Sequence, residues 1–277
     1  MSRKVPIAIF LGLVFAGTNA ALGQQSTWDK DIESGDRACR SGHYEEAEAL
    51  YKMGLSSCEG KTGHDSPGAA RCMTSLAALY KQQKKYTQAE ELYTKALKIR
   101  ENCKQKNPTD VASTLELLAG LYRLEGKDTE AEPLYKRAIE ITNKVFGLNS
   151  FAAGAGLSGL AALYKDQGRF GEAEALYDRL IVRTEKKGGP MCPILSPSLN
   201  SLATIYSAEG KFEQAEKAVK RAIAIEEQEL GSDQPHLAVL FENYAAILKK
   251  AGKTDEATKM EARVQAIQKT KSNEGIQ

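Results

Sequence analysis

Residues 76–97 read LAALYKQQKKYTQAEELYTKAL, and residues 160–181 repeat almost the same phrase as LAALYKDQGRFGEAEALYDRLI. An alanine at one phase of this phrase recurs six times, with 42 residues between successive copies: Ala47, Ala89, Ala131, Ala173, Ala215 and Ala257. A period of about 20 to 50 residues is typical of stacked architectures, in which each unit buries its apolar face against the next unit. The sequence therefore predicts an array of six such units.

Each unit has the pattern of two helices joined by a turn. In the second copy, Met73, Leu76, Ala77 and Tyr80 follow the spacing of one helical face, and a second apolar series begins at Tyr86. Glycine, which ends a helix at the lowest conformational cost, recurs between the two series, with Lys84 as the exception: Gly42, Gly126, Gly168, Gly210 and Gly252. The pattern predicts helix, turn, helix.

Three further positions recur with the same period. Small residues in the first helix are expected to let two helices approach closely: Gly35, Ala77, Ala119, Ala161, Ala203 and Ala245. Tyrosines one turn later are expected to pack in the core: Tyr80, Tyr122, Tyr164 and Tyr206. Glutamates that follow the marker alanine are interpreted as charges that stabilise the start of the second helix: Glu48, Glu90, Glu132, Glu174 and Glu216.

The small residue, the Gly-x-aromatic-x-x-Ala segment and the downstream aromatic together resemble the tetratricopeptide repeat family. The period of 42 residues and the connector GSDQPHLAVLFENYAAI at 231–247 are similar to the kinesin-light-chain type in particular. The resemblance implies an all-α fold, a right-handed α-solenoid of about six stacked helix-turn-helix repeats over residues 24–267. It also implies a protein that binds peptides or partner proteins on its concave face and is not an enzyme. Residues 268–277 are expected to form a flexible tail.

The first 23 residues have the pattern of a secretory signal. Arg3 and Lys4 precede an apolar run over residues 5–16, and the small-residue segment before Gln24 offers a cleavage site. The apolar run is shorter than the roughly 20 residues of a membrane-spanning helix, although an uncleaved anchor remains the alternative. We therefore expect export to the periplasm or the extracellular medium, without stable membrane insertion after cleavage.

Charge and motifs exclude several classes of function. Loss of residues 1–23 removes two positive charges from the net charge of +2 and leaves it at zero, which disfavours nucleic-acid binding. No nucleophile elbow, phosphate loop, His-Glu-x-x-His or dinucleotide fingerprint occurs, so we expect no enzyme and no cofactor. No metal site is expected either, because Cys-x-x-Cys is missing and His43, His64 and His236 lie far apart.

The resemblance places the first helix of each pair on the concave surface. At one equivalent position of these helices the residues are Lys81, Arg123, Lys165, Ser207 and Lys249, and a neighbouring position carries small residues. This cation column predicts binding of an extended chain that carries carboxylates or a free C-terminus. Asn200 and Asn243 match asparagines of the family and are expected to bond a peptide backbone, while Glu116 and Glu242 allow a partner of mixed charge. The alternative is that the cations only stabilise helix C-termini and solubility.

Five cysteines in an exported chain favour disulfides. Cys58 and Cys72 flank the connector between the first two units, and a bridge between them is the predicted pairing. The odd count leaves at least one thiol. We therefore expect a non-enzymatic scaffold that binds a protein or peptide in its groove. The alternatives are a structural subunit of a cell-envelope assembly that uses its convex face or ends, and an enzyme of unrecognised type; the oligomeric state stays open.

Overall fold

The computed structural model describes residues 27–103, 107–148, 151–230 and 235–274. Over these residues it contains twelve α-helices, one short 3-10 helix and no strand. The helices are α1 (Thr27–Arg40), α2 (Tyr44–Thr62), α3 (Pro67–Gln82), α4 (Tyr86–Asn102), α5 (Pro108–Leu124), α6 (Asp128–Phe146), α7 (Gly154–Asp166), α8 (Phe170–Gly188), α9 (Leu195–Ala208), α10 (Phe212–Leu230), α11 (Pro235–Lys250) and α12 (Thr254–Glu274), with η1 (Phe151–Ala153) before α7. The predicted all-α class is confirmed. The predicted signal segment 1–23 lies outside the described residues.

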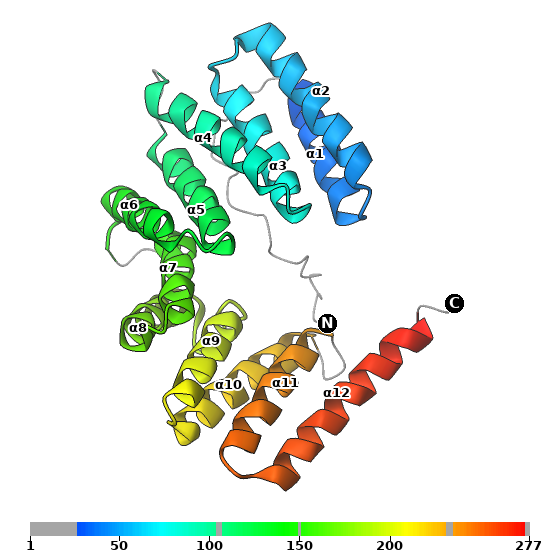
Figure 1. The fold of residues 1–277 in the computed structure, drawn as a ribbon, viewed down its shortest axis with the longest axis vertical. Coiled ribbons are helices and arrows are strands. Elements are labelled where there is room, and N and C mark those ends of the chain that lie inside the picture. Colours follow the sequence, from blue (N-terminus) through cyan, green and yellow to red (C-terminus); the bar gives the residue numbers. More distant parts are fainter. Residues whose placement is uncertain (1–26, 104–106, 149–150, 231–234, 275–277) are drawn as a thin grey trace, which may run out of the picture.

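The helices form six antiparallel pairs, α1 with α2 through α11 with α12, which match the six sequence units. The first helices of successive pairs also contact one another, from α1 and α3 to α9 and α11. Figure 1 shows the pairs following an open curve, with α3, α5 and α7 toward its inside and α4, α6 and α8 toward its outside. We call the first helices of the six pairs the inner layer (α1, α3, α5, α7, α9 and α11) and the second helices the outer layer (α2, α4, α6, α8, α10 and α12).

The turns between paired helices follow the predicted glycine pattern. Each of these glycines has a positive φ: Gly42, Gly126, Gly168, Gly210 and Gly252. Lys84 adopts the same backbone conformation with a φ of 61° and is the non-glycine exception among the described residues. One residue after each turn, a backbone N–H returns to the first helix, as in the 2.8 Å bond from Lys85 to the carbonyl of Tyr80. This bond satisfies a carbonyl that the helix end leaves open.

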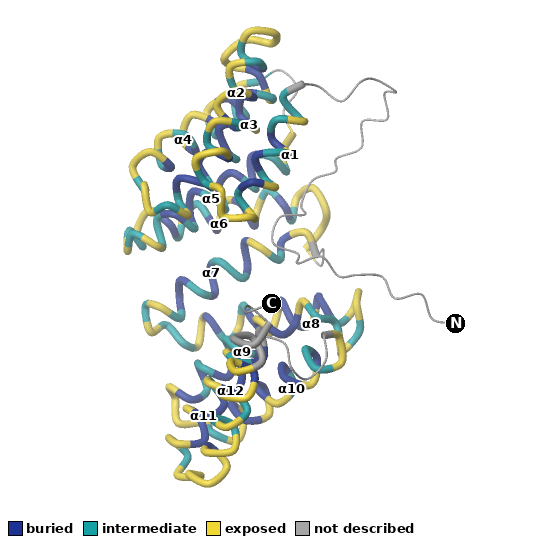
Figure 2. Tube along the Cα trace, turned by 90° about the vertical axis from the view of Figure 1, so that its right-hand side faces the viewer, coloured by how far each residue is buried: buried dark blue, intermediate teal, exposed yellow. Residues whose placement is uncertain are grey.

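The core lies between the layers and is continuous from one pair to the next. All six marker alanines are fully buried. Four tyrosines of the outer layer are buried: Tyr51, Tyr93, Tyr135 and Tyr177. Tyr51 and Tyr135 lie against glycines of the inner layer. A Cβ added to Gly35 would lie 2.6 Å from Cε1 of Tyr51, so this close approach requires a glycine. Figure 2 shows the buried stripe along each helix, with exposed residues at the turns.

The described helices differ from the expected repeat boundary at the carboxyl end, and they do not meet the requirements of a membrane span. Helix α12 continues to Glu274, beyond the boundary at residue 267 that we expected for the repeat array. In the described part of the chain, no helix combines the length and the apolar character that a membrane crossing requires.

Candidate functional site

The structure places the predicted cation column on the inner layer. Lys81, Arg123, Lys165 and Lys249 lie in the last turns of α3, α5, α7 and α11. The first three side chains are partly buried and Lys249 is exposed, while Ser207 on α9 is buried. Because successive first helices contact one another, these residues occupy one phase of one layer.

Two of these cations already have a carboxylate partner inside the chain. Nη1 of Arg123 lies 2.6 Å from Oδ2 of Asp166, which belongs to the next first helix. Lys249 pairs with Glu261 of α12, at the position where four other repeats carry a buried tyrosine. Neither cation is available in full to an external acid, because a bound carboxylate would compete with the internal one.

The register between successive first helices explains why Lys81 and Lys165 lack the kind of carboxylate partner that Arg123 has. Contacts between successive first helices join residues 43 positions apart, such as Arg123 with Asp166 and Cys39 with Gln82. The same offset matches Lys81 with Leu124, and Lys165 with Ala208. Neither residue carries a charge, and no ion pair joins Lys81 or Lys165 to an acid among the described residues. Burial, together with the nearby Arg123, lowers the pKa of Lys81.

The two predicted asparagines are brought together by the same offset. Nδ2 of Asn243 donates to Oδ1 of Asn200 at 3.0 Å, across the contact between α9 and α11. Their side chains are partly buried on the inner layer. Each amide keeps further hydrogen-bonding capacity beyond this one bond, and its expected contact with a peptide backbone stays a prediction.

Known proteins provide an independent test of this architecture. The family model described as tetratricopeptide repeat matches residues 35–102, 110–183 and 194–270. The chain belongs to the tetratricopeptide repeat family. No curated protein sequence matches this tetratricopeptide repeat chain significantly.

Solved structures show the same fold. BtubC (BKLC) from P. vanneervenii superposes on this tetratricopeptide repeat chain with a TM-score of 0.68, at 22% identity, over 90% of this chain and 93% of that one. A putative kinesin light chain from Podosopora anserina gives 0.63 at 24% identity over 74% and 98%. PilW, a type IV pilus biogenesis factor, gives 0.65 at 18% identity over 88% and 94%. At these identities the similarity shows a shared fold. The proteins that share it include a kinesin-light-chain-like repeat protein.

The sequence did not reveal the clasp that joins neighbouring tetratricopeptide repeats. The recurring glutamates accept a hydrogen bond of 2.9 to 3.0 Å from the tyrosine of the next first helix: Tyr80 to Glu48, Tyr122 to Glu90, Tyr164 to Glu132 and Tyr206 to Glu174. A cation after the following turn pairs with the same glutamate: Lys85, Lys127, Arg169 and Lys211. The signal is present in the sequence as a tyrosine 32 residues and a cation 37 residues after each of these glutamates.

Buried acid and phenol groups lie behind the inner surface of the repeats. Burial raises the pKa of Glu116 on α5 to about 7, while a backbone hydrogen bond from Gly156 on α7 opposes this shift. Its negative charge is therefore partly lost near neutral pH. Burial also raises the pKa of Tyr135 and of Tyr177, and the buried hydroxyl of Tyr93 has no hydrogen-bond partner in the described part of the chain.

Cys58 and Cys72 are both free thiols in this structure, so the predicted bridge is not formed here. They are fully buried in one core cluster, and burial, with Cys58 nearby, raises the pKa of Cys72 to about 12. The pairing stays a prediction. Within the described residues, no three side chains of His, Cys, Asp or Glu come together as a metal site.

Proposed function

We propose that this tetratricopeptide repeat protein is a non-enzymatic scaffold that binds an acidic segment of a partner protein on its inner layer, with Lys81 and Lys165 as the anchors. One observation carries the proposal. These two cations lie in the same layer without a carboxylate partner among the described residues, whereas Arg123 and Lys249 have theirs. A partly buried cation without a counter-ion attracts an anion more strongly than a paired one.

The spacing of the anchors limits the ligand. Lys81 and Lys165 are two repeats apart, which corresponds to about 20 Å at about 10 Å per helix layer. An extended chain covers this distance in about six residues, at about 3.3 Å per residue. The preferred ligand therefore carries two acidic side chains about six residues apart. Leu124, which is 53% exposed between the anchors, favours an apolar side chain at the centre of that segment.

Binding of synthetic peptides tests the proposal. Fluorescence anisotropy would compare extended peptides whose two glutamates are separated by three to nine residues, a range that brackets the estimate of about six. We expect the double variant Lys81→Glu/Lys165→Glu to bind the best peptide about tenfold more weakly or worse, the effect of losing charge-assisted contacts. Lys249→Glu is the matched control, because it reverses the same charge in the same column at a cation that is already paired.

Two results would contradict the proposal. The first is equal affinity of the wild type and the double variant for every peptide, which would leave the cations as solubility features. The second is an equal loss in Lys249→Glu, which would indicate a non-specific effect of net charge. Circular dichroism should show the same helicity for all variants, because the three lysines lie at partly or fully exposed sites.

We propose in addition that the chain is exported, with residues 1–23 as its signal. The support is the sequence pattern together with the presence of PilW and Pseudomonas aeruginosa pilF, at a TM-score of 0.60 for the latter, among the similar structures. Amino-terminal sequencing of the protein from the cell envelope or the medium tests this. A mature chain that begins near Gln24 supports export, and an intact Met1 in the cytosol contradicts it.

A further inference from the structure

A second set of ion pairs joins the helices of the outer layer. Arginine and glutamate 36 residues apart connect successive second helices at three boundaries: Glu101 with Arg137, Glu185 with Arg221 and Glu227 with Arg263. At the boundary between α6 and α8, the same register holds Asn143 and Arg179. An asparagine carries no charge, so this boundary lacks the ion pair that its neighbours have.

Arg179 finds no carboxylate elsewhere in the described part of the chain. Its side chain is exposed, and the residues three and four positions away on α8 are Ala175, Leu176, Val182 and Arg183. Helical neighbours at these distances are the ones that form ion pairs along one helix, and none of them is acidic. Arg179 is therefore an uncompensated cation that faces the boundary.

A second arginine lies beside it and is buried. Arg183 is 5% exposed and occupies a position where other second helices carry an isoleucine, such as Ile99 and Ile225. Its Nη2 donates to the carbonyl of Leu148, while Nε and Nη1 have no partner among the described residues. A buried charge without an opposite charge destabilises a protein, so this site would be stabilised by an incoming acid.

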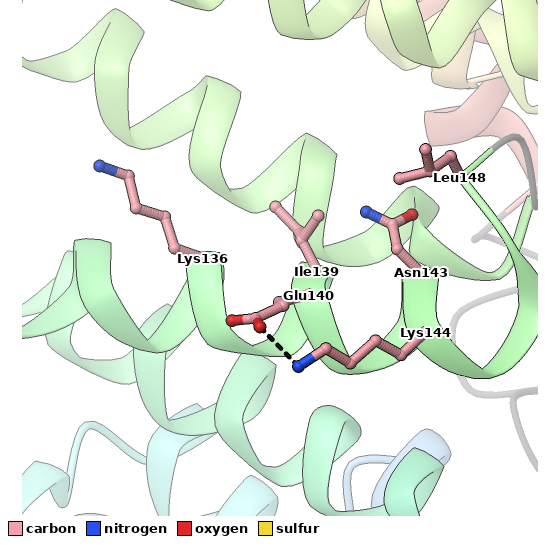
Figure 3. A pocket seen from close by; sticks show the side chains of 6 residues that line it. All are labelled: Lys136, Ile139, Glu140, Asn143, Lys144 and Leu148. Atoms are coloured by element: carbon pink, nitrogen blue, oxygen red, sulfur yellow. Dashed lines mark ion pairs between the residues drawn. The ribbon is translucent and has the colours of Figure 1, made fainter.

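A hollow of about 500 Å³ lies on α6, and Asn143 is one of its lining residues. It is lined by Lys136, Ile139, Glu140, Asn143, Lys144 and Leu148, and Figure 3 shows Ile139, Asn143 and Leu148 on one side of it. Lys144 and Glu140 pair with each other at 2.7 Å, and Lys136 pairs with Glu132. Oδ1 of Asn143 is buried without a hydrogen-bond partner in the described region.

Exposed apolar side chains occur at the carboxyl end of α6, just after it, and on α8. Leu148 is 67% exposed, Val182 on α8 is 63% exposed and Phe146 is 52% exposed. Exposed apolar side chains are typical of protein interaction surfaces, and Leu148 belongs to the lining of the hollow. The hollow is open rather than enclosed, which fits a side chain of a larger partner better than a small molecule that must be surrounded.

We propose that the boundary between α6 and α8 binds a segment of a partner protein that presents an aspartate or glutamate next to an apolar side chain. The carboxylate takes the place of the missing glutamate and pairs with Arg179, with Arg183 adding to the local positive charge. The apolar side chain enters the hollow beside Ile139 and Leu148. This surface belongs to the outer layer and is separate from the cation column of the inner layer.

A peptide array tests the proposal. Short immobilised peptides would carry one glutamate flanked by varied apolar residues, each beside a copy with glutamine, and the labelled full chain would be applied. We expect spots that require glutamate for the wild type, and a loss of about tenfold or more for Arg179→Ala and Asn143→Glu. Asn143→Glu supplies the acid within the chain, as at the other boundaries.

The chain offers a matched control and several decisive outcomes. Arg221→Ala removes the same charge at the same register, where Glu185 pairs with it, and should keep the spots. Lys81→Glu/Lys165→Glu should also keep them, since it changes the other layer. The proposal is wrong if no spot distinguishes glutamate from glutamine, if Arg179→Ala keeps the spots, or if the inner-layer variant loses them. A dimer in sedimentation that Asn143→Glu abolishes would instead assign this surface to a second copy of the chain.

Discussion

The hydroxyl of Tyr164 donates a 2.9 Å hydrogen bond to Oε1 of Glu132, across the boundary between the third and fourth repeats. The other carboxylate oxygen accepts from Nη1 of Arg169 at 2.8 Å, and the guanidinium of Arg169 lies 3.8 Å from the ring centroid of Tyr164. Each member is thus held by the other two. In a repeat array, contacts between neighbours supply the stability that one hairpin lacks, and this clasp is such a contact.

The clasp should make stability depend on pH through Glu132. Lys136, and also Arg169 and Tyr164, hold the pKa of Glu132 at about 2. An unfolded glutamate titrates near 4.3, so the unfolded chain binds the proton more tightly. The contribution of Glu132 is therefore present above about pH 4.3 and is lost as the pH falls toward 2.

Glu132→Gln provides the measurement. We expect it to lower the unfolding free energy by about 1 to 2 kcal/mol near pH 7, because the ion pairs are lost while glutamine can still accept from Tyr164. Urea denaturation followed by circular dichroism should show this difference shrinking as the pH falls. A difference that is constant with pH would mean that the charge of Glu132 does not contribute.

Lys84→Gly should stabilise the protein. Lys84 has a φ of 61° at the position where five other repeats carry glycine. A side chain in this left-handed conformation destabilises the folded state by about 1 to 2 kcal/mol. Glycine removes this strain, but it also has more conformational freedom in the unfolded chain, which offsets part of the gain. We expect a gain of about 0.5 to 1 kcal/mol in urea denaturation. The reciprocal variant Gly168→Ala, at a φ of 74° with open space around it, should lose a similar amount.

Gly159→Ala should destabilise the contact between the third and fourth repeats. A Cβ at this position would lie 2.6 Å from Cζ of Tyr135, and this ring is buried and has little room to move. Overpacking of this kind typically costs about 1 to 3 kcal/mol, more than alanine gains over glycine as a helix former. Gly171→Ala on α8 is the control, because nothing lies within 4 Å of its added Cβ. Thermal melts should separate the two, and equal midpoints would show that Tyr135 adapts.

The disulfide between Cys58 and Cys72 remains a prediction, which depends on the proposed export of the chain. Maleimide labelling of the denatured, non-reduced chain, followed by mass spectrometry, should leave these two cysteines unlabelled. Replacing both with serine should then cost about 3 kcal/mol, the value for a closed loop of about 15 residues. Five labelled cysteines without reductant would contradict the pairing.

The repeat period, the helix pairs and the buried alanines could be predicted because each depends on spacing within one unit. The Gly35 and Tyr51 contact illustrates this: the small residue and the aromatic recur at fixed phases, and the structure places them together. The structure places the predicted cations in the last turns of first helices, and their role in binding stays a prediction.

The sequence of one repeat could not predict which of the four cations has a carboxylate partner. Whether a cation is paired depends on the stagger between first helices, which sets Arg123 against Asp166 but Lys81 against Leu124. The role of Glu132 was missed for a similar reason. Its position after the marker alanine suggests a helix-start charge, and its partners come from the next repeat, 32 and 37 residues away.

The clasp has a direction. Its acceptor always belongs to the earlier repeat, and its tyrosine and cation donors always belong to the later one. A chain that emerges amino end first, at about 5 to 20 residues per second during synthesis, therefore offers each new hairpin an acceptor that is already in place. The tyrosine of each new hairpin can therefore form its hydrogen bond without any residue that is synthesised later. The repeats can thus pack onto one another in the same order in which they are synthesised.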